Sequence, residues 1–138
     1  MSDLPSLPCA LAEPLPLPRL SEGSRTFADG WIVFVKRGCP TCQQVEPLLA
    51  RLAREGLPII ACSQDDPAFP GGVPVHDDRS LELSYRWAIE ATPTLVRIAG
   101  GIETGRATGW DRAAWVELGG DAVATNAEAL ALPPMQPG

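Results

Sequence analysis

The chain has 138 residues and a formal net charge of −6, with 45% hydrophobic and 20% charged residues. This length suits one domain that buries its own core, and the negative charge argues against nucleic acid or an anionic membrane as the main partner. No stretch approaches the roughly 18 apolar residues that a membrane-spanning helix needs, so we expect no membrane segment.

The first 29 residues are rich in proline and leucine and show no sustained period. They lack the basic start and continuous apolar core of a secretory signal, because prolines interrupt every apolar run. We therefore expect an extended N-terminal arm over residues 1–29 and a cytoplasmic protein. In a reducing compartment, the four cysteines are more typical of redox cycling or metal binding than of a structural disulfide framework.

The folded domain is expected over residues 30–120. An apolar run of β-branched and aromatic residues predicts a buried strand from Trp31 to about Lys36. Apolar residues at helical spacing then predict a helix from about 40 to 55, which Pro47 should kink. A second strand is predicted over Leu57–Ala61.

Residues 63–78 carry many turn signals and predict a loop whose acidic side chains are solvated. Ser80 is expected to cap a short helix that reaches Trp87.

The last part of the domain is predicted to form a hairpin and a helix. The strands Thr94–Ile98 and Ile102–Thr108 flank a Gly-Gly turn, and Asp111 should cap the helix that follows. From 121 to 138 the composition drifts into Ala, Pro and Gly, which predicts a loosely ordered tail.

The strongest chemical signal is Cys39-Pro40-Thr41-Cys42, directly after the first predicted strand. Proline suits the first position of a helix, so Cys39 is predicted to lie at a helix N-terminus. There, free N–H groups and the helix dipole favour its thiolate, and Arg37 nearby would lower its pKa further. Cys39 is therefore the candidate nucleophile of dithiol–disulfide exchange, with Cys42 as the resolving thiol.

Other roles for the cysteines stay open. Cys39 and Cys42 would be half of a zinc site if two of Cys9, Cys62 and His76 completed it. These three residues contain no second close pair, so the sequence favours exchange and predicts no metal. Cys62 is either a small buried hydrophobe or a third redox thiol. Cys9, in the arm, is an exposed thiol, a cysteine that pairs with a partner, or incidental.

No cofactor is expected, because the chain carries no G-x-G-x-x-G or other cofactor motif. Electrons would then come from another protein or from a small thiol, and a flavin-dependent disulfide reductase is one donor class. The expected substrates are protein disulfides or small thiols.

The order of strand, C-x-x-C helix, strand, helix, Thr-Pro-Thr, hairpin and helix resembles the thioredoxin-like superfamily over about residues 31–118. Three matches carry the resemblance: the Cys39–Cys42 motif, Pro47 five residues beyond it, and Ala91–Leu95, which is similar to the family's cis-proline loop. The resemblance implies an α/β domain with a central mixed sheet of four or five strands flanked by helices.

The same resemblance implies a substrate site. Pro93 would be a cis residue, and its neighbour Thr92 would offer backbone N–H and C=O groups to an extended substrate by strand addition. Pro40 and Thr41 would line this site. The alternative for Pro93 is an ordinary trans proline that opens a strand.

Two further features concern the branch and its chemistry. The segment Ser63–Pro67 and the short helix before the proline loop resemble the TlpA/ResA-like branch, whose members are usually exported or membrane-tethered, unlike our expectation here. Val33 stands where thioredoxins carry a buried aspartate, which helps to move the proton of the second cysteine.

These departures leave an alternative function open. The domain would then be a partner-specific binding or electron-relay module with little general reductase activity, recognising its partner through the Thr92–Pro93 edge and the N-terminal arm. Peroxidase activity at Cys39 is less favoured, because C-x-x-C at a helix start is typical of disulfide exchange.

Overall fold

The computed structural model describes residues 29–138, so the predicted arm, including Cys9, lies outside the described residues except for Asp29. The described elements are β1 (Gly30–Val35), α1 (Pro40–Arg54), β2 (Ile59–Ser63), β3 (Val75–Asp77), α2 (Glu82–Arg86), β4 (Thr94–Ala99), β5 (Ile102–Thr108), β6 (Trp110–Asp111), α3 (Arg112–Gly119), α4 (Asp121–Ala129) and β7 (Met135–Gln136).

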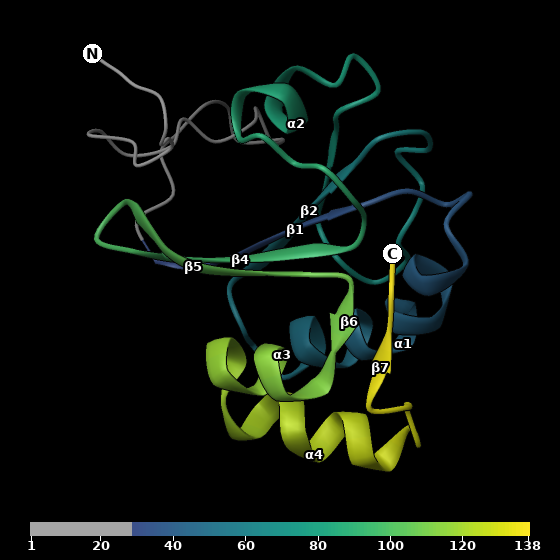
Figure 1. Cartoon of the computed structure of the whole chain (residues 1–138), viewed down its shortest axis with the longest axis vertical. Coiled ribbons are helices and arrows are strands. Elements are labelled where there is room, and N and C mark those ends of the chain that lie inside the picture. Colours follow the sequence, from purple (N-terminus) through teal and green to yellow (C-terminus); the bar gives the residue numbers. More distant parts are fainter. Residues whose placement is uncertain (1–28) are drawn as a thin grey trace.

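Five strands form one mixed sheet in the order β3-β2-β1-β4-β5 (Figure 1). β1 pairs in parallel with β2, and β2 pairs in parallel with β3. β4 runs antiparallel to both of its neighbours, β1 and β5. The predicted α/β class, with a central mixed sheet flanked by helices, is confirmed.

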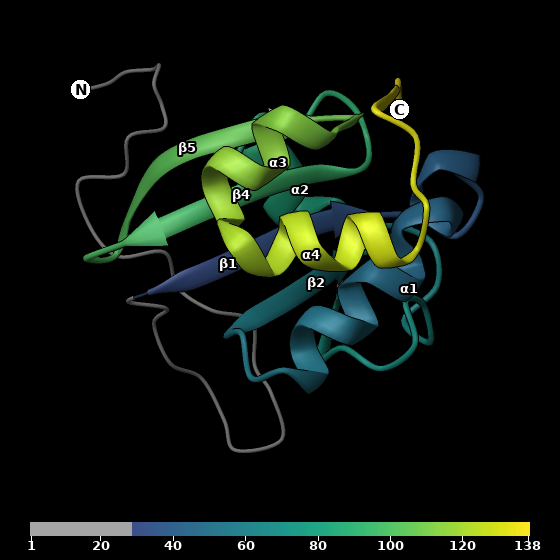
Figure 2. The same ribbon diagram turned by 90° about the horizontal axis from the view of Figure 1, so that it is seen from below.

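The helices cover the two faces of the sheet unequally. α2 lies on one face, whereas α1, α3 and α4 lie on the other (Figures 1 and 2). Because successive side chains of a strand point to opposite faces, Val33 and Val35 of β1 pack toward α1, and Ile32 and Phe34 pack toward α2. The apolar run in β1 is thus buried on both sides.

The local pattern of α1 explains how the helix is placed. It begins at Pro40, and its apolar residues Val45, Leu48, Leu49 and Leu52 are all buried against the sheet. Burying each of these leucines contributes about 1.5–3 kcal/mol to the free energy of folding.

The structure corrects the prediction of a loosely ordered tail over 121–138. Val123 and Ala127 of α4 are buried in the same core as α1. Asn126 of α4 accepts a hydrogen bond from Arg51 at 2.7 Å and donates one to Glu55 at 3.0 Å. The buried residues of α4 that contact the α1 core are small, so the hydrophobic periodicity of the α4 sequence is weak. The helix is nevertheless packed against α1.

The loop prediction over 63–78 is also partly wrong. This segment contains β3, and Asp78 behind it is only 1% exposed rather than solvated. The Asp78 carboxylate accepts hydrogen bonds from the backbone N–H groups of Leu83 and Ser84 at 3.0 and 2.9 Å, and from the Ser84 hydroxyl at 2.6 Å. Asp78 therefore anchors the start of α2, and the predicted Ser80 contributes one longer hydrogen bond, accepted from the Glu82 N–H at 3.4 Å.

Candidate active site

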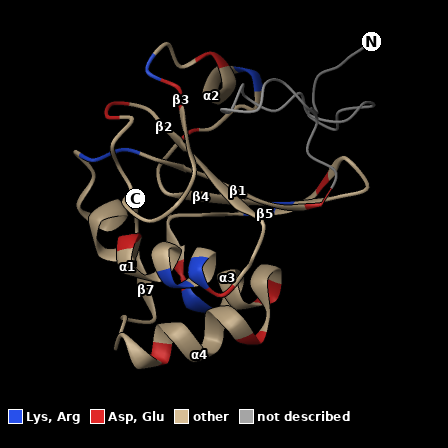
Figure 3. Cartoon of the chain, turned by 180° about the vertical axis from the view of Figure 1, so that it is seen from behind, with Lys and Arg blue, Asp and Glu red and all other residues tan. Residues whose placement is uncertain are grey.

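The turn between β1 and α1 positions Cys39, and an acidic loop holds that turn. Asp65, just after β2, accepts hydrogen bonds from the backbone N–H groups of Arg37 at 2.7 Å and Gly38 at 2.9 Å. Figure 3 shows the basic turn in blue beside the acidic loop in red. The parallel pairing of β1 and β2 brings both strand ends to the same edge. Sequence reasoning missed Asp65, whose position after a neighbouring strand was the available signal.

Arg37 lies beside this loop as well. Its guanidinium forms an ion pair with Asp66 and lies 5.2 Å from the ring centroid of Phe69. The predicted role of Arg37 was to lower the pKa of Cys39. These contacts instead direct its charge toward the loop after β2, so its position fits an anchor of the turn.

Cys39 is the N-cap residue of α1, with Pro40 exposed at the first helical position. Burial alone would raise the pKa of Cys39. Hydrogen bonds from the backbone N–H of Cys42, the Cys42 and Thr92 side chains and the backbone of Thr41 outweigh burial, and the pKa is lowered. The Cys42 N–H lies 3.4 Å from the Cys39 Sγ. The helix start therefore favours the thiolate of the leading cysteine.

Cys42 is one helical turn further and fully buried. Burial raises its pKa to about 12, against the opposing effect of the Lys36 N–H, which lies 3.5 Å from its sulfur. A hydrogen bond with Cys39 and the charge of that residue raise the pKa further. The two thiols thus differ in acidity although only two residues separate them.

The loop at Thr92 closes the other side of the site. The Thr92–Pro93 peptide bond is cis, and the Cys39 thiol donates a hydrogen bond to the Thr92 carbonyl at 3.4 Å. Gly109 donates its N–H to the Pro93 carbonyl at 2.7 Å, which connects the loop to the end of β5. Cys39, Cys42, Thr41 and Thr92 therefore meet at one place.

No protein-family model and no curated protein match the chain. Among solved structures, it is similar to the Chlorobium tepidum protein assigned as thiol:disulfide interchange protein DsbE, at 17% identity over 86% of this chain and 94% of that one, with a TM-score of 0.57. The chain has a thioredoxin-like fold. Peroxiredoxin Q from Xanthomonas campestris matches at 21% identity over 85% of this chain and 89% of that one, with a TM-score of 0.45.

In this thioredoxin-like domain Cys62 lies apart from the pair. Its fully buried side chain belongs to the cluster on the α2 face, whereas Cys39 and Cys42 belong to the cluster on the α1 face. Burial raises the pKa of Cys62, and the charge of Asp78 adds to this effect. The position matches the buried hydrophobe and does not match a third redox thiol.

The described residues considered as further zinc ligands, Cys62 and His76, do not lie beside Cys39 and Cys42. His76 pairs in register with Cys62 across β3 and β2, away from Cys39. Within residues 29–138 no group of three or more His, Cys, Asp or Glu side chains could hold a metal ion. Nor is any helix in that range long and apolar enough to cross a membrane.

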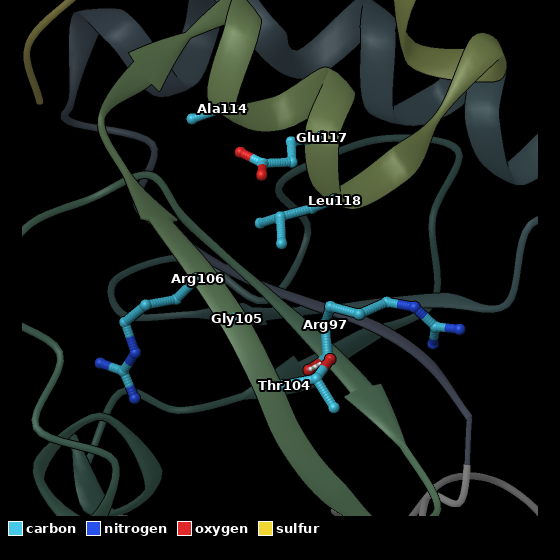
Figure 4. A pocket seen from close by; sticks show the side chains of 7 residues that line it. All are labelled: Arg97, Thr104, Gly105, Arg106, Ala114, Glu117 and Leu118. Atoms are coloured by element: carbon cyan, nitrogen blue, oxygen red, sulfur yellow. Dashed lines mark hydrogen bonds between the residues drawn. The ribbon is translucent and has the colours of Figure 1, made fainter.

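A separate pocket of about 450 Å³ lies between the β4–β5 hairpin and α3. Its two arginines point away from each other (Figure 4). Arg97 lies 4.5 Å from the ring centroid of Trp31, and Arg106 forms an ion pair with Glu103 at 2.6 Å. The charges do not converge on one point, so this pocket lacks the geometry of an anion site.

Proposed function

We propose that this protein is a thiol–disulfide oxidoreductase, in which the Cys39–Cys42 pair exchanges with disulfides of proteins or small thiols. The observation that carries the proposal is the difference in acidity between two thiols one helical turn apart. Cys39 has a lowered pKa, and Cys42 has one raised to about 12. Because the thiolate is the nucleophile, the pair has one attacking sulfur and one that stays protonated until needed.

In the first step the Cys39 thiolate attacks one sulfur of a substrate disulfide. A bond forms between Cys39 and that sulfur, the substrate S–S bond breaks, and the other substrate sulfur leaves as a thiolate that takes up a proton. The Thr92 carbonyl beside Cys39 and the N–H groups of the first turn of α1 surround the reacting sulfur.

In the second step Cys42 loses its proton and attacks the Cys39 sulfur. The Cys39–Cys42 disulfide forms, and the second substrate thiol is released. The substrate has then gained two electrons and two protons. The protein has lost two electrons and the Cys42 proton, and the second proton comes from the solvent that received it when Cys39 ionised. The charge of a Cys39 thiolate raises the pKa of Cys42, so converting Cys39 to a mixed disulfide removes that effect and eases the loss of the Cys42 proton.

The proposal extends to partners and location. A small thiol or a protein donor, such as one served by a flavin-dependent disulfide reductase, would reduce the Cys39–Cys42 disulfide again. The exchange would take place in the cytoplasm, with protein disulfides or small thiols as substrates.

The test is the redox equilibrium of the pair against a series of glutathione buffers. Thiol alkylation and mass spectrometry would follow the Cys39–Cys42 disulfide, with Cys9 and Cys62 scored separately. A potential near about −270 mV indicates a reductant, whereas one near about −120 mV indicates an oxidant and a more oxidising compartment. Failure to form the Cys39–Cys42 disulfide in any buffer refutes the proposal.

One observation favours a second candidate, a partner-specific relay module. Val33 is fully buried where thioredoxins carry an aspartate, and it belongs to the same cluster as Cys42. The structure therefore places an apolar side chain where the resemblance implies a proton acceptor. Slow turnover of unrelated protein disulfides, together with loss of a specific partner when residues 1–29 are removed, supports this module; fast turnover that survives the removal supports a general reductase.

A further inference from the structure

The C-terminal end of the chain returns to the candidate active site. After α4, residues 133–138, here called the C-terminal strap, run from the far end of α4 toward the start of α1. Figures 1 and 2 both show the end of the chain in yellow beside the start of α1. Thr41 and Pro137, 96 positions apart in the sequence, thus meet at the start of α1.

The first part of the strap is firmly held. β7 pairs antiparallel with β6. The indole N–H of Trp110, a fully buried side chain, donates a hydrogen bond to the Pro133 carbonyl at 2.6 Å. The backbone N–H of Arg112 donates another to the Pro134 carbonyl at 2.9 Å. These contacts hold the strap as far as the end of β7.

The last two residues of the strap lie against Thr41 and Thr92, the residues on either side of the reactive thiol. The Thr41 hydroxyl donates a hydrogen bond to the Pro137 carbonyl at 2.7 Å. Gly138 packs so closely on Thr92 that a Cβ at this position would lie 2.0 Å from the Thr92 carbonyl oxygen. That oxygen is the acceptor for the Cys39 thiol. Cys39 itself is only 6% exposed, too little for a disulfide of a folded protein to reach its sulfur.

The strap therefore engages the residues that substrate recognition would use. An extended substrate that adds to the Thr92 edge needs the space beside its carbonyl, and Gly138 fills that space. A substrate that contacts the N-terminal turn of α1 meets Thr41, whose hydroxyl is already bonded to Pro137. Only a residue without a side chain fits at position 138 against Thr92, so glycine is suited to this close contact.

We infer that the C-terminal strap is a built-in cover of the active site, which occupies the place of an extended substrate and must lift before a protein disulfide reaches Cys39. This inference rests on the proposed function. Residues 137 and 138 are both exposed to solvent, and β7 holds only the segment before them. A shift of residues 137 and 138 therefore breaks their contacts with Thr41, Thr92 and Gly109 and leaves the pairing of β6 with β7 in place.

The first test measures access to Cys39 without requiring any exchange activity. Reduced wild-type protein and a Gly138→Leu variant are treated with iodoacetamide, and mass spectrometry follows alkylation of Cys39. In this reaction the thiolate sulfur bonds to carbon and iodide leaves. The leucine side chain cannot fit beside the Thr92 carbonyl, so the strap must shift. We expect Cys39 alkylation to accelerate about two- to tenfold, the factor that corresponds to losing one hydrogen bond.

Two controls make this measurement decisive. Rates are recorded across a pH range, so that the plateau at high pH reports access and the midpoint reports the pKa of Cys39. Met135→Leu changes an exposed side chain of the same strap and should leave both quantities unchanged. If the circular dichroism spectrum shows that Gly138→Leu is unfolded, a variant that lacks residues 137 and 138 is used in its place. An unchanged plateau in a folded Gly138→Leu or deletion variant overturns the inference.

The second test separates the cover from the exchange reaction. With the strap displaced, reduction of a polypeptide disulfide should accelerate more than reduction of oxidised glutathione, because only the larger substrate needs the space of the strap. Equal acceleration of both refutes a substrate-like role of the strap. In a third outcome, Gly138→Leu accelerates alkylation while neither the variant nor the wild type forms the Cys39–Cys42 disulfide. That result refutes the proposed function but supports the strap as a cover of Cys39.

Discussion

The two faces of the sheet hold cysteines in opposite chemical situations. On the α1 face, Cys39 lies beyond the end of β1, where backbone N–H groups of the helix surround its sulfur and lower its pKa. On the α2 face, Cys62 lies within β2 in an apolar cluster with Phe34 and Trp87, and its pKa is raised. Both side chains are buried. The comparison shows that the N–H donors near Cys39, rather than burial, account for the opposite directions of the two pKa shifts.

Two aspartates that follow strands also have different roles. Asp65 holds the turn that presents Cys39, whereas Asp78 is buried and anchors α2. One carboxylate therefore supports the candidate site and the other supports the fold. Substitutions on the two faces should accordingly affect different measurements.

The largest effect is expected from Cys39→Ser, which removes the attacking thiolate. Reduction of a disulfide substrate should fall to the uncatalysed rate, because a serine hydroxyl does not form a disulfide. Cys42→Ser should instead accumulate the mixed disulfide between Cys39 and substrate, visible by mass spectrometry. Full activity in Cys39→Ser would mean that another cysteine attacks.

Next in size is Asp78→Ala on the opposite face. It leaves the buried N–H groups of Leu83 and Ser84 without their acceptor, which costs about 1–3 kcal/mol for each unsatisfied group. Urea unfolding should show this loss, while the potential of the Cys39–Cys42 pair stays the same. The matched control is Asp77→Ala, an exposed carboxylate paired with Arg79. Equal destabilisation by both variants would contradict the anchoring role of Asp78.

The pH dependence of alkylation should separate Cys39 from Cys42. Since only the thiolate reacts, the rate rises with pH through each pKa. Cys39 should reach half of its maximal rate at a lower pH than a cysteine of the unfolded chain, because its pKa is lowered. Cys42, with a pKa of about 12, should stay unmodified near neutral pH. Faster alkylation of Cys42 than of Cys39 at pH 7 would reverse their assigned roles.

A smaller effect is expected from Asp65→Ala. Without this carboxylate the backbone N–H groups of Arg37 and Gly38 lose their acceptor, and the turn before Cys39 becomes less ordered. Exchange should slow several-fold, about the factor for one or two hydrogen bonds, and the midpoint of Cys39 alkylation should shift. Glu128→Ala, on the exposed side of α4, is the control; an identical slowing there would point to a general effect of lost charge.

The smallest effect on chemistry should come from Cys62→Ala. Exchange by the Cys39–Cys42 pair should match the wild type, since Cys62 lies on the other face of the sheet. Stability should fall by about 1 kcal/mol, because a buried sulfur is removed from a packed cluster. A changed redox potential in this variant would revive Cys62 as a third redox thiol.

Local patterns alone determined a large part of this protein. The apolar run of β1, the helical spacing of α1 and the Gly-Gly turn between β4 and β5 each specify an element through contacts close in sequence. Pro40 after Cys39 places the helix start, so the candidate nucleophile was predictable as well. These features depend on backbone preferences and on the burial of one face, which the sequence carries directly.

Tertiary structure decided the rest. β3 is a strand because it pairs with β2, and Asp78 is buried because it accepts the N–H groups of a helix that follows it in the chain. α4 has a weak pattern of its own and is stabilised by contact with α1. The return of residues 137 and 138 to Thr41 and Thr92 depends on β7 pairing with β6. The strand pairings, the α1–α4 contact and the return of residues 137 and 138 join segments distant in sequence, whereas the Asp78 hydrogen bonds span only five and six residues. None of these contacts is encoded by the preference of a single residue.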